Sequence, residues 1–431
     1  MPSPSTPLPA SLSNNFSFLY EKALRALFLI MIILYPFSNL ISLILSVLGV
    51  LALFSQSARK HWHTIQYRTW CIASLLLVMI ALINAINSPI SIHACIKELG
   101  HYLLFIPMLF IGSLFIKNSH KSQALRFLLI SCSIMAVGQL TSITLGVLTS
   151  QHNTLAAALS HHSLISKILT QLTQRHTQDR GPFLAIGLLL SASQLQKRDM
   201  NHQKKQLIGH ILRYLSLCLL FTIALFTQTE RIGYLCFLVA IGFLGYQKLG
   251  IKGLILAAAS ASLLLLLAYR FLPTHLHQTM IFKQKIAGLI SGPAQQQHDR
   301  STQLRINGLA YAWDNVRYKP LLGFGVGTFH TEQPTSNFIP ATHEFSVEPT
   351  YVLIALQLGL VGLLCFVIIL LGYWRTLSFQ TKGRAHDAQG ILLILCTGAL
   401  TFPLFLGSAG LAMLSIGVAT QLWSVPFSEA P

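Results

Sequence analysis

The residues best suited to acid–base chemistry stand in one polar stretch just before a long apolar run. His343, Glu344 and Glu348 precede Pro349, where an apolar run over 349–374 begins. A histidine or a carboxylate at this place can take a proton from a hydroxyl group. The same residues also suit a solvated loop that leads into a helix, because an acidic residue before a proline favours a helix N-terminus. The residues alone leave both interpretations open.

A second candidate is an arginine at the edge of the apolar segments. Glu230 and Arg231 separate the apolar runs 207–228 and 232–247, with almost no loop around them. A charge at the edge of a bilayer is costly unless it is paired or faces a wet cavity. Arg231 therefore either faces such a cavity, or pairs with Glu230, or extends to lipid phosphates as an interfacial arginine.

A third candidate is the segment that runs from Arg300 to Phe329. The spacing predicts a helix over 301–316, with Pro320 ending it. One face of this helix would hold Leu304, Gly308, Tyr311 and Asn315. The glycines after it, at 323, 325 and 327, permit a tight and irregular backbone. This glycine spacing follows no strand and opens no nucleotide-binding unit, so it does not indicate a dinucleotide site.

The composition shows which elements must position these residues. The chain has 431 residues, of which 53% are hydrophobic and only 10% are charged. A soluble domain carries about 25% charged residues. The apolar runs have the length needed to cross a bilayer. The expected fold is therefore all-α, a polytopic membrane protein in a single integral domain over 1–431. The seven cysteines have no metal-site spacing and predict no disulfide framework.

We expect about twelve transmembrane helices, at 23–38, 39–55, 69–86, 99–116, 127–149, 182–195, 207–228, 232–247, 253–272, 349–374, 389–403 and 405–424. Lysine and arginine gather in the short loops of one side, which indicates the cytoplasmic side. Both termini are then cytoplasmic, and the acidic residues lie mostly outside. This topology explains part of the net charge of +18, and no nucleic-acid partner is predicted.

One large periplasmic loop, 273–348, lies between the ninth and tenth spans and contains the predicted helix. A translocated loop of about 75 residues is usually functional. A second outer segment, 150–181, carries several histidines together with Arg175 and Arg180. The polar chemistry of this chain is therefore expected on the outer face of the membrane.

The middle segment resembles a motif of the bacterial O-antigen ligase and O-antigen polymerase superfamily. The match consists of Arg305, then Trp313, then Pro-Leu-Leu-Gly-Phe-Gly-Val-Gly over Pro320–Gly327. This is the most specific part of the resemblance, which covers roughly residues 180–370.

Two further segments are similar to the remaining motifs of that family. Thr227–Gly233 looks like the segment between two central spans, although Glu230 and Ile232 depart from its pattern. Glu348–Gly362 looks like the family's last motif, in which a histidine stands eleven residues before the glycine of a helix. Here that position, counted back from Gly359, holds Glu348.

The resemblance implies a reaction and its partners. A glycan on undecaprenyl pyrophosphate is transferred, with inversion and without a metal or other cofactor, to an acceptor hydroxyl at the periplasmic face of the inner membrane. The acceptor is the lipid A–core in ligases and another lipid-linked glycan in polymerases. Membrane lipids surround the protein.

The resemblance also implies roles for residues. Arginine is always protonated and can bind phosphate in a bidentate way, so Arg231 and Arg305 are expected at the pyrophosphate, and Arg180 could add charge. The base is either His343, moved into place by a small insertion, or Glu348.

Three functions are compatible with these observations. A ligase-type glycosyltransferase is the first expectation. A polymerase of the same fold is the second, because the family histidine is absent at the expected spacing. A transporter of lipid-linked glycans is the third, although transporters place charges near the bilayer midplane and this chain concentrates them in one outer loop.

Overall fold

The computed structural model describes residues 10–34, 40–65, 68–86, 88, 92–103, 105, 110–115, 117–151, 180–196, 204–226, 231–257, 259–260, 263, 300–327, 349–378, 384–400, 404–406, 410, 413–419 and 422. Every regular element within these ranges is a helix. The predicted all-α class is therefore confirmed.

Five helices in the described ranges are long and apolar enough to cross a membrane. Two of them are whole elements, α4 (Thr69–Ile86) and α17 (Thr350–Ser378). The others are Ser119–Thr141 in α7 (Asn118–Gln151), Ile208–Phe226 in α11 (Lys204–Phe226) and Ile232–Leu249 in α12 (Arg231–Leu249). All five fall on predicted spans. The total of twelve spans stays a prediction.

Four other predicted spans coincide with helices that are shorter or differently bounded. These helices are α1 (Ala10–Leu34), α2 (Leu40–Leu53), α10 (Arg180–Gln196) and α18 (Arg384–Ala399). The short helix α3 (Gln56–Ile65) follows α2. The predicted span at 253–272 and the predicted outer segment at 150–181 lie largely outside the described residues.

Two predicted spans contain 3₁₀ or π-helical segments that hydropathy did not predict. At 99–116 the structure has the end of α5 (Ile92–Leu103) and the 3₁₀ helix η2 (Ile111–Phe115). Pro107 stands between them in the sequence, and proline lacks the N–H that an α-helix needs. At 405–424 the described parts are the 3₁₀ helix η3 (Leu404–Leu406) and the π-helical turn η4 (Leu414–Ala419). Both regions are apolar, so composition alone could not show the irregular backbone.

Helix α10 forms the centre of the packed core. It packs against α7, α11, α12 and α18, and its residues from Phe183 to Leu190 are almost entirely buried. Helix α11 contributes Phe221 and Leu225 to this core while Leu212, Leu215 and Leu219 stay exposed. Such an exposed apolar face suits lipid contact. The core therefore holds a short buried helix surrounded by four others.

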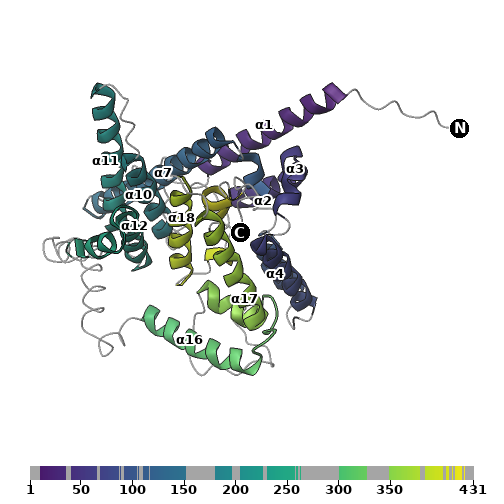
Figure 1. Cartoon of the computed structure of the whole chain (residues 1–431). Coiled ribbons are helices and arrows are strands. Elements are labelled where there is room, and N and C mark those ends of the chain that lie inside the picture. Colours follow the sequence, from purple (N-terminus) through teal and green to yellow (C-terminus); the bar gives the residue numbers. More distant parts are fainter. Residues whose placement is uncertain are drawn as a thin grey trace.

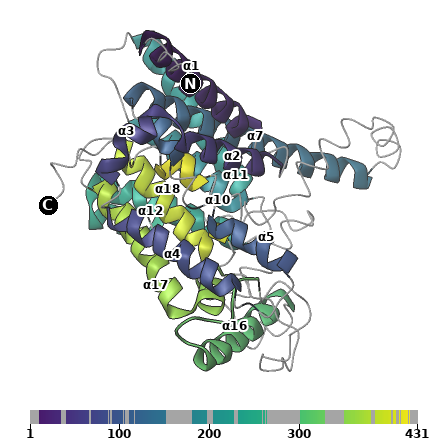
Figure 2. The same ribbon diagram turned by 90° about the vertical axis from the view of Figure 1, so that its right-hand side faces the viewer.

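The second packing unit carries the motif residues. Helices α4 and α17 pack closely along their lengths, and α16 (Arg300–Tyr318) packs on α17. In both views α16 lies at the end of the molecule opposite α1 (Figures 1 and 2). We call this the α16 end. The predicted helix at 301–316 is thus confirmed with slightly wider bounds.

Candidate active site

Helix α16 presents its predicted face to the protein. Gly308, Ala312 and Asn315 are buried, and Asn315 donates its side-chain amide to the Tyr311 carbonyl at 2.8 Å. Burial raises the pKa of the Tyr311 phenol, so this hydroxyl stays protonated at neutral pH. On the opposite face Trp313 is exposed, and the Arg317 guanidinium lies 4.8 Å from its ring centroid. The motif tryptophan is therefore outside the core.

The chain turns sharply after α16. The Lys319 amide still bonds to the Asn315 carbonyl, and the Gly323 amide bonds back to the Lys319 carbonyl. Residues Pro320–Gly327 then form a segment that we call the glycine loop. Its three glycines have positive φ, at 70° for Gly323, 104° for Gly325 and 87° for Gly327. Side chains rarely adopt these angles, which confirms the predicted irregular backbone.

The glycine loop packs into a break in α17. At Gly359 the backbone leaves the helical conformation, with φ 70° and ψ −172°. The loop donates from Phe324 N to Leu356 O at 2.8 Å and from Gly325 N to Gln357 O at 3.0 Å. In return the Leu360 amide donates to the Pro320 carbonyl at 2.8 Å.

These bonds replace the helix bonds that the break removes. A helix broken inside an apolar environment leaves backbone donors and acceptors that water cannot reach, and each costs several kcal/mol if unpaired. Here the glycine loop supplies the partners from outside the helix. The loop and the break therefore form one structural unit, although they come from distant parts of the chain.

The end of α4 holds the other side of the glycine loop. The Asn84 side chain donates to the Leu322 carbonyl at 2.9 Å, and the Ser88 hydroxyl donates to the Val326 carbonyl at 3.0 Å. Asn84 is buried, whereas Leu322 is exposed, so this hydrogen bond is partly buried. These contacts fix the loop between α4 and α17.

A buried polar group from α5 lies against the same junction. The Tyr102 hydroxyl donates to Gln357 Oε1 at 2.7 Å, and both side chains are fully buried. One turn earlier in α5, Glu98 Oε2 lies 3.8 Å from His101 Nδ1. The Tyr102 hydrogen bond thus links α5 to Gln357, whose carbonyl accepts a hydrogen bond from the Gly325 amide.

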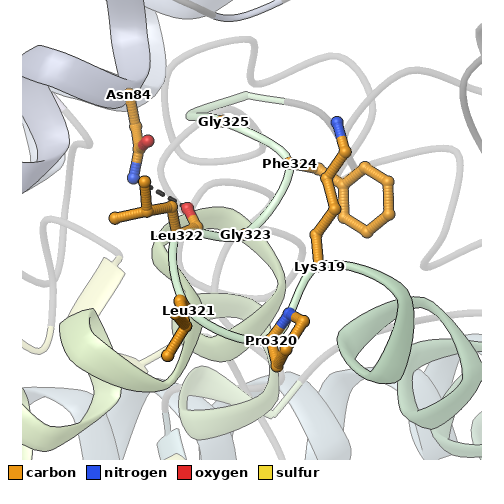
Figure 3. Close-up of a pocket in the computed structure, with 8 residues that line it drawn as sticks. All are labelled: Asn84, Lys319, Pro320, Leu321, Leu322, Gly323, Phe324 and Gly325. Atoms are coloured by element: carbon orange, nitrogen blue, oxygen red, sulfur yellow. Dashed lines mark hydrogen bonds between the residues drawn. The ribbon is translucent and has the colours of Figure 1, made fainter.

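A cavity of about 400 Å³ lies between the glycine loop and α4. Asn84 and the residues from Lys319 to Gly325 line it (Figure 3). The Lys319 ammonium lies 4.9 Å from the centroid of the Phe324 ring, within the range of a cation–π contact. The cavity therefore combines a positive charge with apolar walls.

The structure places the backbones of the three predicted pyrophosphate arginines. Arg180 is the first residue of α10, Arg231 is the first residue of α12, and Arg305 lies in the second turn of α16. Helices α10, α11 and α12 are consecutive, mutually packed and joined by short connections, so α10 and α12 run in the same direction. Arg180 and Arg231 therefore begin their helices at the same end.

That end is the α16 end. Tyr351 at the start of α17 donates to the Cys396 carbonyl near the end of α18, at 3.2 Å. A Cβ added to Gly398, two residues further, would stand 3.0 Å from Pro182 in the first turn of α10. The starts of α10 and α17 are thus neighbours. The positive ends of the α10 and α12 dipoles add to the arginine charges there.

The two predicted base candidates, His343 and Glu348, lie outside the described residues. Within the ranges that the structure describes, no three His, Cys, Asp or Glu side chains gather closely enough to hold a metal ion.

Sequence reasoning missed the residues that build the junction, chiefly Asn84, Tyr102, Lys319 and Gln357. A polar side chain inside an apolar run, such as Gln357 in 349–374, is the signal that could have identified one of them.

These observations define an integral membrane protein with a built site at one end of its helices. The comparison with known families then gives its class. Residues 216–367 match the family model described as O-antigen ligase, Wzy_C. This part of the chain is thus similar to the O-antigen ligase family, whose members are membrane enzymes that transfer glycans from lipid-linked substrates. No curated protein matches the chain.

The matched region contains Arg231, Arg305, the glycine loop and the break at Gly359, whereas Arg180 lies before it. The resemblance stated from the motifs is therefore confirmed. The family is found in the inner membrane, in agreement with the membrane-spanning helices of this chain.

Proposed function

We propose that this protein is an O-antigen ligase-type glycosyltransferase that moves a glycan from undecaprenyl pyrophosphate to a hydroxyl of the lipid A–core. One observation carries the proposal: Pro320–Gly327, the most specific part of the resemblance, bonds to α17 at Gly359–Gly362, the end of the last similar segment, within the matched region. Their junction lies at the end of the molecule where Arg180 and Arg231 begin their helices. In the predicted topology this end is periplasmic.

The chemistry follows from the groups at that end. The leaving group is a pyrophosphate, whose charge needs fixed cations to stabilise it in the transition state. Arg231 and Arg305 supply these charges, with Arg180 as a further one, and no metal is needed. Arginine suits this role because it stays protonated and binds phosphate through two parallel hydrogen bonds.

The acceptor hydroxyl needs a base to remove its proton. His343 or Glu348 takes this role, since both stand shortly before α17 in the sequence. Attack from the face opposite the pyrophosphate inverts the sugar carbon.

A polymerase is the second candidate, and one observation favours it. The position eleven residues before Gly359 holds Glu348 followed by Pro349, where the family ligases have histidine. In a polymerase the acceptor would be a second lipid-linked glycan. A transporter is less well supported, because the break in α17 is filled by the protein's own glycine loop.

Deletion of the gene, followed by gel electrophoresis of the surface glycolipids, separates these functions. Loss of all O-chains from lipid A, with polymer retained on the lipid carrier, is the result expected for a ligase. A core that bears a single repeat unit would identify a polymerase. Unchanged glycolipids would contradict both enzymes. A plasmid with the wild-type gene should restore the original pattern.

A further inference from the structure

The cavity beside the glycine loop has a charged side and an apolar side. On one side stands the Lys319 ammonium against the Phe324 ring. Within the described part of the chain, no carboxylate pairs with this ammonium. On the other side are Leu321 and Leu322, which are 65% and 56% exposed. Two large exposed leucines next to an exposed lysine suit a ligand that carries both an anion and a hydrocarbon chain.

The apolar side continues into surfaces that suit lipid contact. The Leu321 carbonyl accepts a bond from the Val361 amide at 3.4 Å, which places Leu321 beside the exposed Leu360 of α17. Across the cavity α4 ends in Ile86, which is 84% exposed. Exposed apolar side chains on helices long enough to span a membrane face lipid. In the predicted topology the cavity then lies near the membrane surface, the level of the lipid phosphates.

The cavity is far from the backbone of Arg305. From Arg305 to Tyr318 the chain is continuous helix, and 1.5 Å per residue gives a separation of about 20 Å. Lys319 follows directly. A single pyrophosphate cannot contact groups at both ends of such a helix. Arg305 and Lys319 are therefore too far apart to bind the same pyrophosphate.

We propose that the Lys319 cavity binds the phosphate of the lipid-anchored acceptor, while the arginines bind the pyrophosphate of the donor. This inference rests on the proposed function, which requires two lipid-anchored substrates at one site. Lys319 makes a charge-assisted contact with the acceptor phosphate, and Leu321 and Leu322 contact its hydrocarbon chains. The shared chemistry is a phosphate on a lipid-anchored glycan, as in phosphorylated lipid A–core or in a lipid-linked repeat unit.

Steady-state kinetics of the full chain in nanodiscs test this assignment. Lys319→Ala should raise the KM for the acceptor about tenfold, which corresponds to about 1.4 kcal/mol of lost binding free energy. The kcat and the donor KM should not change, and Lys319→Arg should stay near wild type. Lys248→Ala, which removes an exposed lysine in the last turn of α12, is the matched control.

A second arm uses the acceptor itself. Lipid A–core and a lipid-linked repeat unit are each offered with and without their phosphates. For the wild-type protein, removal of the phosphates from the true acceptor should raise its KM about as much as Lys319→Ala does. In the Lys319→Ala variant, removal of the phosphates should raise the KM no further. A rise in the KM for the donor would overturn the assignment. So would additive effects of Lys319→Ala and of phosphate removal on the KM for the acceptor.

A binding readout separates failure of this inference from failure of the proposed function. Native mass spectrometry without donor measures acceptor retention by the wild type and by Lys319→Ala. Lower retention in the variant supports the cavity even if no transfer is detected, in which case only the proposed function fails. Equal retention overturns the inference. Displacement of the acceptor by an equal concentration of phosphatidylglycerol would also overturn it, because the site would then bind any lipid phosphate.

Discussion

Gly323 and Gly359 lie backbone against backbone, each with a φ of 70°. A Cβ on Gly323 would stand 2.6 Å from the Gly359 amide nitrogen, and a Cβ on Gly359 would overlap the Leu321 carbonyl. This contact lets the glycine loop reach the free backbone groups of the α17 break. The architecture of the site therefore depends on two residues that have no side chains.

Alanine at either glycine should destabilise the protein. We expect Gly323→Ala and Gly359→Ala each to lower the free energy of unfolding by about 3 kcal/mol, because steric overlap and positive φ both contribute. Thermal unfolding in detergent measures the change. Gly100→Ala is the control, since a Cβ there meets nothing within 4 Å. An unchanged midpoint for both site variants would contradict the described junction.

The Tyr102–Gln357 bond should contribute measurably to stability. Tyr102→Phe leaves a buried glutamine without its donor, so we expect a loss of about 1–3 kcal/mol. The double variant with Gln357→Leu should recover part of this loss, because no polar group is then left unpaired. Unfolding midpoints of the single and double variants give the coupling. Tyr246→Phe, at an exposed tyrosine of α12, should have no effect. Additive losses would show that the two side chains do not interact.

Neutral substitutions of the arginines should reduce transfer without removing the protein from the membrane. Arg231→Ala and Arg305→Ala are each expected to lower kcat/KM by about 100-fold or more, the usual effect of losing one preorganised contact to developing charge. Lysine at these positions should retain only part of the activity, since it lacks the planar fork.

Arg180→Ala should act in the same direction. Arg213→Ala, on the exposed surface of α11, is the matched control. Transfer near the wild-type rate in Arg305→Ala would refute the pyrophosphate role.

The two base candidates can be separated by pH profiles. We expect one of His343→Ala and Glu348→Gln to abolish transfer and the other to keep most of the activity. If Glu348 is the base, activity of the wild type should rise through a pH near ~4.3, whereas His343 would place that rise near ~6.5. Substantial activity in both variants would exclude both residues as the base.

The sequence by itself determined the features that depend on local chemistry. Apolar runs predicted the all-α membrane class and the bounds of α4, because crossing a bilayer requires a minimum length of each span. Periodicity predicted the helix at 301–316 and placed Gly308 and Asn315 on one face of it, but the burial of that face came from the structure. Three alternating glycines after Pro320 predicted the irregular loop.

Only the tertiary structure decided what these elements contact. Hydropathy cannot distinguish the buried helix α10 from the exposed face of α11, because membrane helices are apolar all round. Nor could composition reveal the break at Gly359, since the residues around it read as an ordinary span. The break is stable only because a loop that is distant in sequence supplies hydrogen bonds to it. The partners of the glycine loop, Asn84 and the Gln357 carbonyl, were for the same reason beyond any local pattern.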